Sequence, residues 1–210
     1  GVMIKPSDEI SEEFVPQWQA MARLARACDR EFLTTEALGF GRAGLLGACD
    51  VFVMHAWCGM DFIPQIKEAG AEAWWYFSCD CDNPNFFIKS DWIEMRAIPW
   101  LTWQRQLDGV LRWSYSYWNA DPFEDAYCGM HQFPAGDCHM VYPGPEGPVP
   151  SVRWEIFREG VQDYEYLKMF HDGLGRLPAA AREPIEKQAR ARIQRVAGPD
   201  TPYPFAAGIE

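Results

Sequence analysis

Two adjacent acids, Asp8 and Glu9, are the residues whose types and spacing point most directly to chemistry. They lie between an apolar run predicted to be a strand, residues 1–6, and a periodic pattern predicted to be a helix, residues 11–28. Acids at the start of a helix often only cap it and complement its dipole, and composition alone favours that interpretation. The alternative is catalytic, because a carboxylic acid and a carboxylate are the groups that cleave glycosidic bonds.

Adjacent carboxylates suit one glycosidase mechanism better than the others. The usual mechanisms need two carboxyl groups about 5–9 Å apart, on opposite sides of the scissile bond. Neighbours in sequence fit the substrate-assisted mechanism instead, in which the 2-acetamido group of the sugar attacks the anomeric carbon. Glu9, with the longer side chain, is then the predicted proton donor, and Asp8 the group that orients the acetamide. A sugar without an acetamide would need another carboxylate, for which Glu36 and Asp121 are the candidates.

Aromatic side chains are unusually frequent, which supports a sugar pocket. Ten Trp, eight Tyr and thirteen Phe make up 15% of the chain. Most of these rings belong in a core, but flat rings with a polar edge also stack on sugars, bases and cations. The candidate substrate-binding residues stand near the ends of predicted strands: His55, Trp57, Tyr76, Ser116 and Trp118.

The elements that must position these residues alternate between strand and helix. The hydrophobic pattern predicts strands at residues 1–6, 31–37, 50–57, 72–78 and 109–118. It predicts helices at residues 11–28, 62–69, 86–107 (interrupted at Pro99), 151–174 and 178–197, with a long loop at 119–150 and a Pro-rich tail. Such alternation is typical of an α/β fold with a parallel sheet covered by helices.

Two architectures fit that order, a doubly wound sheet and part of a (β/α)₈ barrel. No G-x-G-x-x-G or P-loop follows a strand, so a nucleotide site of the usual kind is not expected. The barrel is favoured because the candidate residues lie at the carboxyl ends of several strands, where barrels carry their active sites. Five strands cannot close a (β/α)₈ barrel, which typically has ~250 residues. We therefore expect this chain to contain about strands four to eight of such a barrel. Residues 1–175 would be this barrel part, and residues 176–210 a helix and tail.

Charge and composition exclude other classes. The 19 Lys+Arg against 30 Asp+Glu give a net charge of −11, which argues against nucleic-acid binding and against anionic membrane surfaces. No apolar run reaches the ~20 residues of a membrane helix, so membrane insertion is not expected. The seven Cys do not indicate a compartment, and bacterial secreted, periplasmic and cytoplasmic locations stay open. Since the chain begins Gly-Val-Met-Ile, we expect an N-terminal portion to precede it.

A series of short motifs resembles the catalytic domain of glycoside hydrolase family 123. Each is weak alone, but they occur in the family's order: Trp74-Trp75-Tyr76, Pro84-Asn85-Phe86-Phe87-Ile88, Ile93-Glu94-x-Arg96, Pro99-Trp100-Leu101-x-Trp103, Asp108-Gly109-Val110-Leu111, Tyr142-Pro143-Gly144, Gly147-Pro148-Val149-Pro150-Ser151-Val152-Arg153 and Glu159-Gly160-x-x-Asp163-Tyr164-Glu165-Tyr166-Leu167. Asp8-Glu9 resembles the family's acidic pair at the end of the fourth barrel strand.

The resemblance implies retaining, substrate-assisted cleavage of a terminal β-linked N-acetylhexosamine, with N-acetylgalactosamine favoured. It implies Asp8 and Glu9 as the catalytic pair, no metal or cofactor, and a glycan or glycoconjugate as the substrate. It also implies that the first half of the barrel, and a β-sandwich domain before it, precede this chain. Ser116 departs from the family's Asn, which usually helps to hold the sugar, and Arg112 from an aromatic residue. The alternatives are a non-catalytic carbohydrate-binding or scaffold barrel, or a glycosidase for a different sugar.

The fifth predicted strand suggests which of its side chains would face the sugar. Alternation puts Arg112, Ser116 and Trp118 on one face, and Leu111 on the other with bulkier neighbours. We expect the smaller, more polar face to line the barrel interior, and the bulky face to pack on helices. Trp118 is then the predicted sugar platform, and the hydroxyl of Tyr76 is predicted to hold the acetamide oxygen.

Overall fold

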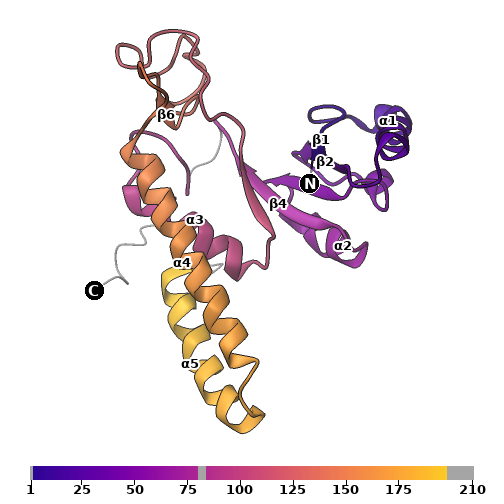
Figure 1. Ribbon diagram of the computed structural model, residues 1–210, viewed down its shortest axis with the longest axis vertical. Helices are drawn as coiled ribbons and strands as arrows, with labels where there is room; N and C mark the ends of the chain where they lie inside the picture. The colour runs from indigo at the N-terminus through magenta and orange to yellow at the C-terminus, as the bar shows by residue number, and fades with distance from the viewer. Residues whose placement is uncertain (1, 80–83, 198–210) are drawn as a thin grey trace. The chain divides into compact units, whose positions relative to one another are not determined.

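The computed structural model describes residues 2–79 and 84–197 (Figure 1). By its contacts the chain divides into two compact units, Gly1–Ser78 with Leu107–Trp113, and Cys79–Gln106 with Ser114–Glu210. The boundary expected near residue 175 stays a prediction, and the Pro-rich tail after residue 197 lies outside the described residues. Within the described part, none of the helices combines the length and the apolar character needed to span a bilayer.

The first unit contains a parallel sheet of five strands, which confirms the predicted α/β class. The strands follow one another across the sheet in chain order: β1 (Met3–Ile4), β2 (Leu33–Leu38), β3 (Val51–His55), β4 (Glu72–Phe77) and β5 (Gly109–Arg112). A doubly wound sheet reverses its strand order at a switch point, and the described strands have no such reversal. The connecting helices and 3-10 turns are η1 (Glu12–Phe14), α1 (Val15–Cys28), η2 (Ala43–Leu45), η3 (Met60–Phe62) and α2 (Ile63–Glu68).

The strand register separates two faces of this sheet. One face, called here the cluster face, carries the buried apolar cluster, with two partly buried hydrophobic side chains packed against it: Ala37, Val51, Val53, Tyr76, Trp74 and Leu111. The opposite face, called here the helix face, carries Glu36 and Phe52. Phe52 packs edge-on against Phe62 at the start of α2, with ring centroids 6.2 Å apart. Every residue of β3 is buried, on the cluster face and on the helix face alike.

The fifth strand is shorter than predicted, and its faces are the reverse of those expected. It ends at Arg112, whereas the sequence pattern continued to residue 118. Leu111 aligns with Tyr76 on the cluster face, while Arg112 aligns with Phe77 on the helix face and donates to its carbonyl oxygen over 3.0 Å. The prediction that Arg112 shares the interior face was therefore wrong. Alternation alone does not tell which of two faces a sheet packs against its helices.

The second unit is built on helices α3 (Trp92–Gln104), α4 (Val152–Leu174) and α5 (Ala179–Ala197), with a small antiparallel pair, β6 (Val141–Tyr142) and β7 (Val149–Pro150). In Figure 1, α4 is the long orange helix. Helix α3 begins six residues later than predicted, and Pro99 lies inside it without interrupting it. Gly160 of α4 permits close packing on α3, because a Cβ there would lie 2.5 Å from the carbonyl oxygen of Arg96. The guanidinium of Arg96 donates to Asp163 over 2.7 Å, which also joins the two helices.

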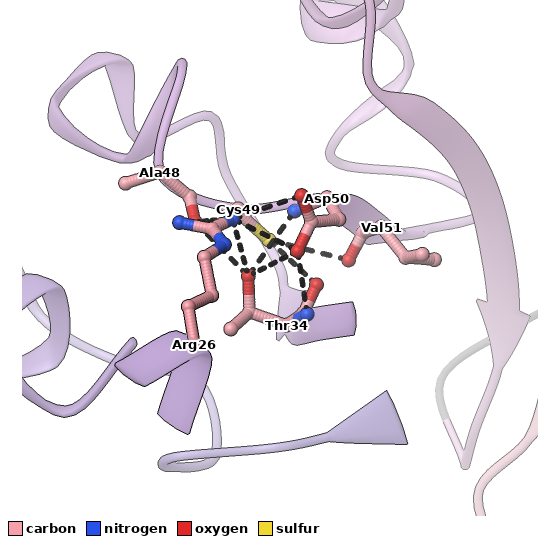
Figure 2. Close-up of polar contacts among 6 residues, drawn as sticks. All are labelled: Arg26, Thr34, Ala48, Cys49, Asp50 and Val51. Carbon is pink, nitrogen blue, oxygen red and sulfur yellow. Dashed lines mark hydrogen bonds and ion pairs between the residues drawn. The ribbon is translucent and has the colours of Figure 1, made fainter. Parts of the chain in front are cut away.

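A polar network lies at the amino ends of β2 and β3 (Figure 2). Asp50 accepts hydrogen bonds from the backbone and hydroxyl of Thr34, at 2.7 and 2.8 Å, and from the guanidinium of Arg26 at 2.8 Å. Burial alone would raise the pKa of Asp50, but the hydrogen bonds from Thr34 and Arg26 outweigh it and lower that pKa. Burial raises the pKa of the neighbouring Cys49 thiol to about 12. This edge is the stabilising end of the sheet, opposite the strand ends that carry the candidate site.

Candidate active site

The loop after β1 brings Asp8 and Glu9 to one pocket. The pocket has a volume of about 420 Å³, and the residues that line it come from this loop and from the start of α1: Ser7, Asp8, Glu9, Ile10, Ser11, Phe14, Gln17, Trp18 and Met21. Among the residues that the structure describes, neither acid caps a helix, since η1 follows Ser11, α1 follows Phe14, and both starts lack a side-chain cap. The helix-capping interpretation of the acidic pair was therefore wrong.

The Asp8 side chain is open to solvent. Its exposed fraction is 77%, and one carboxylate oxygen pairs with the ammonium group of Lys5. An exposed ion pair of this kind contributes little to stability, because water screens it. The carboxylate of Asp8 is thus accessible to a ligand in the pocket, with a cation beside it.

Glu9 is held in a conformation that non-glycine residues rarely adopt. Its φ angle is +51°, in the left-handed region. Its Oε1 accepts a hydrogen bond of 2.6 Å from the hydroxyl of Tyr76, a buried residue of β4. The Tyr76 ring in turn packs edge-on against the His55 ring, with centroids 5.0 Å apart. The hydroxyl oxygen of Ser78 lies 3.3 Å from Nε2 of His55. Glu9 is therefore fastened to the carboxyl ends of β3 and β4, although β1 is not adjacent to either strand.

A third acid, Glu36, lies under the same loop. It is fully buried on the helix face of β2. Its Oε2 accepts hydrogen bonds from the hydroxyl of Ser7 at 3.0 Å and from the indole of Trp18 at 2.7 Å. Its Oε1 accepts from the backbone N–H of Ile10 at 3.4 Å. Glu36 is not among the described residues that line the pocket, so it does not offer the second catalytic carboxylate considered from the sequence.

The structure places the remaining predicted residues as follows. Trp57 lies just beyond the end of β3 and is 53% exposed. Ser116 and Trp118 belong to the second unit, on the loop after β5. The backbone of Ser116 forms an isolated antiparallel β-bridge with His139. The indole N–H of Trp118 donates a hydrogen bond of 3.0 Å to the carbonyl oxygen of Val141. Roles in sugar binding for these residues, and for His55 and Tyr76, stay predictions.

Asp121, the other carboxylate considered from the sequence, also belongs to the second unit. It is exposed, and its carboxylate accepts a hydrogen bond of 2.9 Å from the backbone N–H of Phe123. This contact is that of an Asp in a local turn.

Sequence reasoning missed two features of the site. Glu36 was considered from the sequence only as an alternative catalytic acid. Its hydrogen bonds to the acidic loop and to α1 could not be foreseen, because the three donors lie 18 to 29 residues away in the chain. Trp18 is a fully buried residue of α1, and its indole N–H also donates a hydrogen bond to Glu36. Nothing in the local sequence around residue 36 marks such a contact.

The comparison with known families decides the assignment. The sequence profile described as the glycoside hydrolase 123 catalytic domain matches residues 5–170, which is more than half of the chain. The chain belongs to glycoside hydrolase family 123. The matched range includes the acidic pair, Glu36 and Tyr76, so the geometry above lies inside a family 123 catalytic domain. No curated protein matches the chain.

A solved family 123 structure is similar in fold. It is the family 123 glycoside hydrolase from Clostridium perfringens, studied for the details of glycolipid glycan hydrolysis. The TM-score is 0.73 at 19% sequence identity, and the match covers 92% of this chain and 34% of that one. At this identity the similarity shows the fold alone. The chain spans about a third of the length of the family 123 enzyme that it matches.

Proposed function

We propose that the protein is a retaining glycoside hydrolase that removes a terminal β-linked N-acetylhexosamine by substrate-assisted catalysis. N-acetylgalactosamine is the favoured sugar. One observation carries the proposal: two adjacent acids line one pocket without capping a helix, inside a family 123 catalytic domain. The substrate of the Clostridium perfringens relative, a glycolipid glycan, is of the same general class.

Each acid has a separate role in the proposed reaction. The acetamide oxygen of the sugar attacks the anomeric carbon as Glu9 gives its proton to the leaving oxygen, so that the glycosidic bond breaks and a cyclic oxazolinium ion forms. Asp8 accepts the acetamide N–H and stabilises the positive charge of that ion. Glu9 then takes a proton from water, which opens the ring at the anomeric carbon. Two inversions give net retention of configuration.

The other residues near Glu9 support this assignment. The hydroxyl of Tyr76, which donates to Glu9, is proposed to hold the acetamide oxygen once the sugar is bound. The ammonium group of Lys5 pairs with the carboxylate of Asp8 and places a positive charge beside it. Trp57 and His55, which belong to the same unit as Glu9, are proposed as further contacts to the sugar.

The sheet is proposed to be strands four to eight of a (β/α)₈ barrel. Its five parallel strands in chain order and its acids at a carboxyl edge both fit that fold. The strands that complete the barrel would come from a preceding portion of the full-length protein.

The test is hydrolysis of aryl β-N-acetylgalactosaminide and β-N-acetylglucosaminide by the full-length protein, with Asp8→Asn and Glu9→Gln variants. An activated phenol needs little help to leave, so Glu9→Gln should affect the aryl substrate less than a natural glycoside, which loses about 10²–10⁴-fold without its acid. Asp8→Asn should slow both. Absence of turnover on both sugars, with both acids intact, would contradict the proposal and favour a different sugar or a non-catalytic carbohydrate-binding barrel.

A further inference from the structure

We propose that Glu36 is a positioning residue for the acidic pair, a role that rests on the function proposed for Asp8 and Glu9. It does not touch the pocket in the described structure, and it acts through the loop that carries both acids. Its carboxylate joins the residue before the pair to the residue after it, and joins both to helix α1.

The contacts of Glu36 bracket the acidic pair on both sides. Ser7, immediately before Asp8, donates its hydroxyl hydrogen to Oε2, and Ile10, immediately after Glu9, donates its backbone N–H to Oε1. One rigid strand residue thereby fixes both ends of a two-residue segment. Trp18 donates to the same Oε2 from α1, so the carboxylate itself cannot swing away from the loop.

This clamp explains how Glu9 keeps its left-handed backbone. Sparsely populated φ angles persist at functional sites only where the surroundings over-determine them. The described contacts supply such constraints from two sides. Glu36 holds the backbone at Ile10 from the helix face of the sheet, and Tyr76 holds the Glu9 side chain from the cluster face. Without the contact between Ile10 and Glu36, nothing in the loop's own sequence favours φ = +51° at a glutamate.

The chemistry of the three partners requires a carboxylate at this position. The indole N–H of Trp18 and the backbone N–H of Ile10 can only donate, and they donate to different oxygens of Glu36, Oε2 and Oε1. A Gln at residue 36 has one acceptor oxygen, so its NH₂ group would face one of these two donors. An Asp is one methylene shorter and would not reach both the loop and the helix.

The decisive variant is Glu36→Gln, with Asp50→Asn as its matched control. Both replace a carboxylate that accepts three or more hydrogen bonds, but Asp50 lies at the amino ends of the strands and Glu36 supports the acidic loop. Three quantities are measured in the full-length protein: kcat and KM on an aryl N-acetylhexosaminide, thermal stability, and hydrogen exchange of the Ile10 amide. If Glu36→Gln folds poorly, Trp18→Phe is the second variant: it removes the indole donor to Glu36, together with part of a buried ring, and leaves the Glu36 carboxylate in place.

The expected result for Glu36→Gln is a kcat lower by about 10–100-fold at nearly constant KM, because misplacing a catalytic group by about 1 Å has such an effect. The Ile10 amide should exchange faster, and Trp18→Phe should shift both readouts in the same direction. Asp50→Asn should lose comparable thermal stability while keeping its kcat and its Ile10 protection.

Two results would overturn the inference. One is an unchanged kcat and Ile10 protection in Glu36→Gln. The other is an equal fall of kcat in Asp50→Asn, which would reduce the effect to general stability. If the wild-type protein turns over no aryl N-acetylhexosaminide, the proposed function fails by itself. The exchange rate of the Ile10 amide then still decides whether Glu36 holds the loop.

Discussion

The left-handed backbone at Glu9 predicts that a glycine at this position would relieve strain. A non-glycine residue in this region costs about 1 kcal/mol relative to Gly. Against this gain stands the hydrogen bond of 2.6 Å from Tyr76, which Glu9→Gly removes. A hydrogen bond to an exposed carboxyl group contributes about 1.5–2 kcal/mol, which is larger than the gain at the backbone. Glu9→Gly alone should therefore lower the free energy of unfolding by ~0.5–1 kcal/mol.

A Tyr76→Phe background isolates the strain. With the hydroxyl absent, Glu9→Gly loses nothing at the side chain and keeps the gain at the backbone. It should then raise the free energy of unfolding by about 1 kcal/mol relative to Tyr76→Phe. The assay is urea unfolding of all four proteins in a double-mutant cycle, with a common slope confirming that the unfolding reaction is the same.

Asp8→Gly is the matched control for this cycle. Asp8 is adjacent, exposed and not among the described residues with positive φ. Its replacement should lower stability by ~0.4–1 kcal/mol, because Gly only adds freedom to the unfolded chain there. If Glu9→Gly in the Tyr76→Phe background destabilises as much as Asp8→Gly does, the argument from strain is refuted.

Two further predictions concern stability. Asp50→Asn should lower the free energy of unfolding by about 2 kcal/mol at pH 7. The hydrogen bonds from Thr34 and Arg26 outweigh burial and hold the pKa of Asp50 below its ordinary value. The stabilisation by the Asp50 carboxylate is therefore present above the unfolded pKa of ~3.9 and is lost as pH falls through the lower folded pKa. Urea titrations of wild type and variant measure this loss. A difference in the free energy of unfolding that stays unchanged down to about pH 2–3 would contradict the argument. Gly160→Ala should lower the free energy of unfolding by about 1–3 kcal/mol, because the added Cβ would push α4 away from α3. Gly173→Ala is its control in α4: apart from the nearby backbone of its own helix, no described atom lies within 4 Å of the added Cβ, so the melting temperature should not fall.

The order of the five parallel strands and of the long helices could be read from the hydrophobic pattern, whereas the short pair β6 and β7 lies in the segment predicted to be a loop. The fifth strand was overextended for a physical reason. Alternation continues from Leu111 through Trp118, but beyond Arg112 the chain finds its partners elsewhere: the Ser114 hydroxyl donates to the Cys138 carbonyl, and Tyr115 packs edge-on against Trp154. Periodicity reports that residues alternate in environment, and it does not report what supplies that environment.

The same limit applies to the site. Asp8, Glu9 and Tyr76 could be named because each stands near the end of a strand, and carboxyl ends of parallel strands lie on one edge. That Tyr76 donates to Glu9 itself, 67 residues away, depends on the path of the loop after β1. Glu36 gave no local signal, since a single acid within Leu33–Leu38 has the same appearance whether it faces solvent or a buried indole.

The two edges of the sheet differ in the contacts and the backbone angles of their acidic residues. At the amino edge, Asp50, Thr34 and Arg26 satisfy one another with short hydrogen bonds and ordinary backbone angles. At the carboxyl edge, Asp8 is exposed and pairs with Lys5 of its own loop, whereas Glu9 has a left-handed backbone and accepts a hydrogen bond from Tyr76 of β4. A carboxylate that only stabilised the fold would have no need of a left-handed φ. Glu36 contacts the residue after Glu9, and Tyr76 contacts Glu9 itself, from opposite faces of the sheet, and the proton transfer that we propose for Glu9 would require such a constraint.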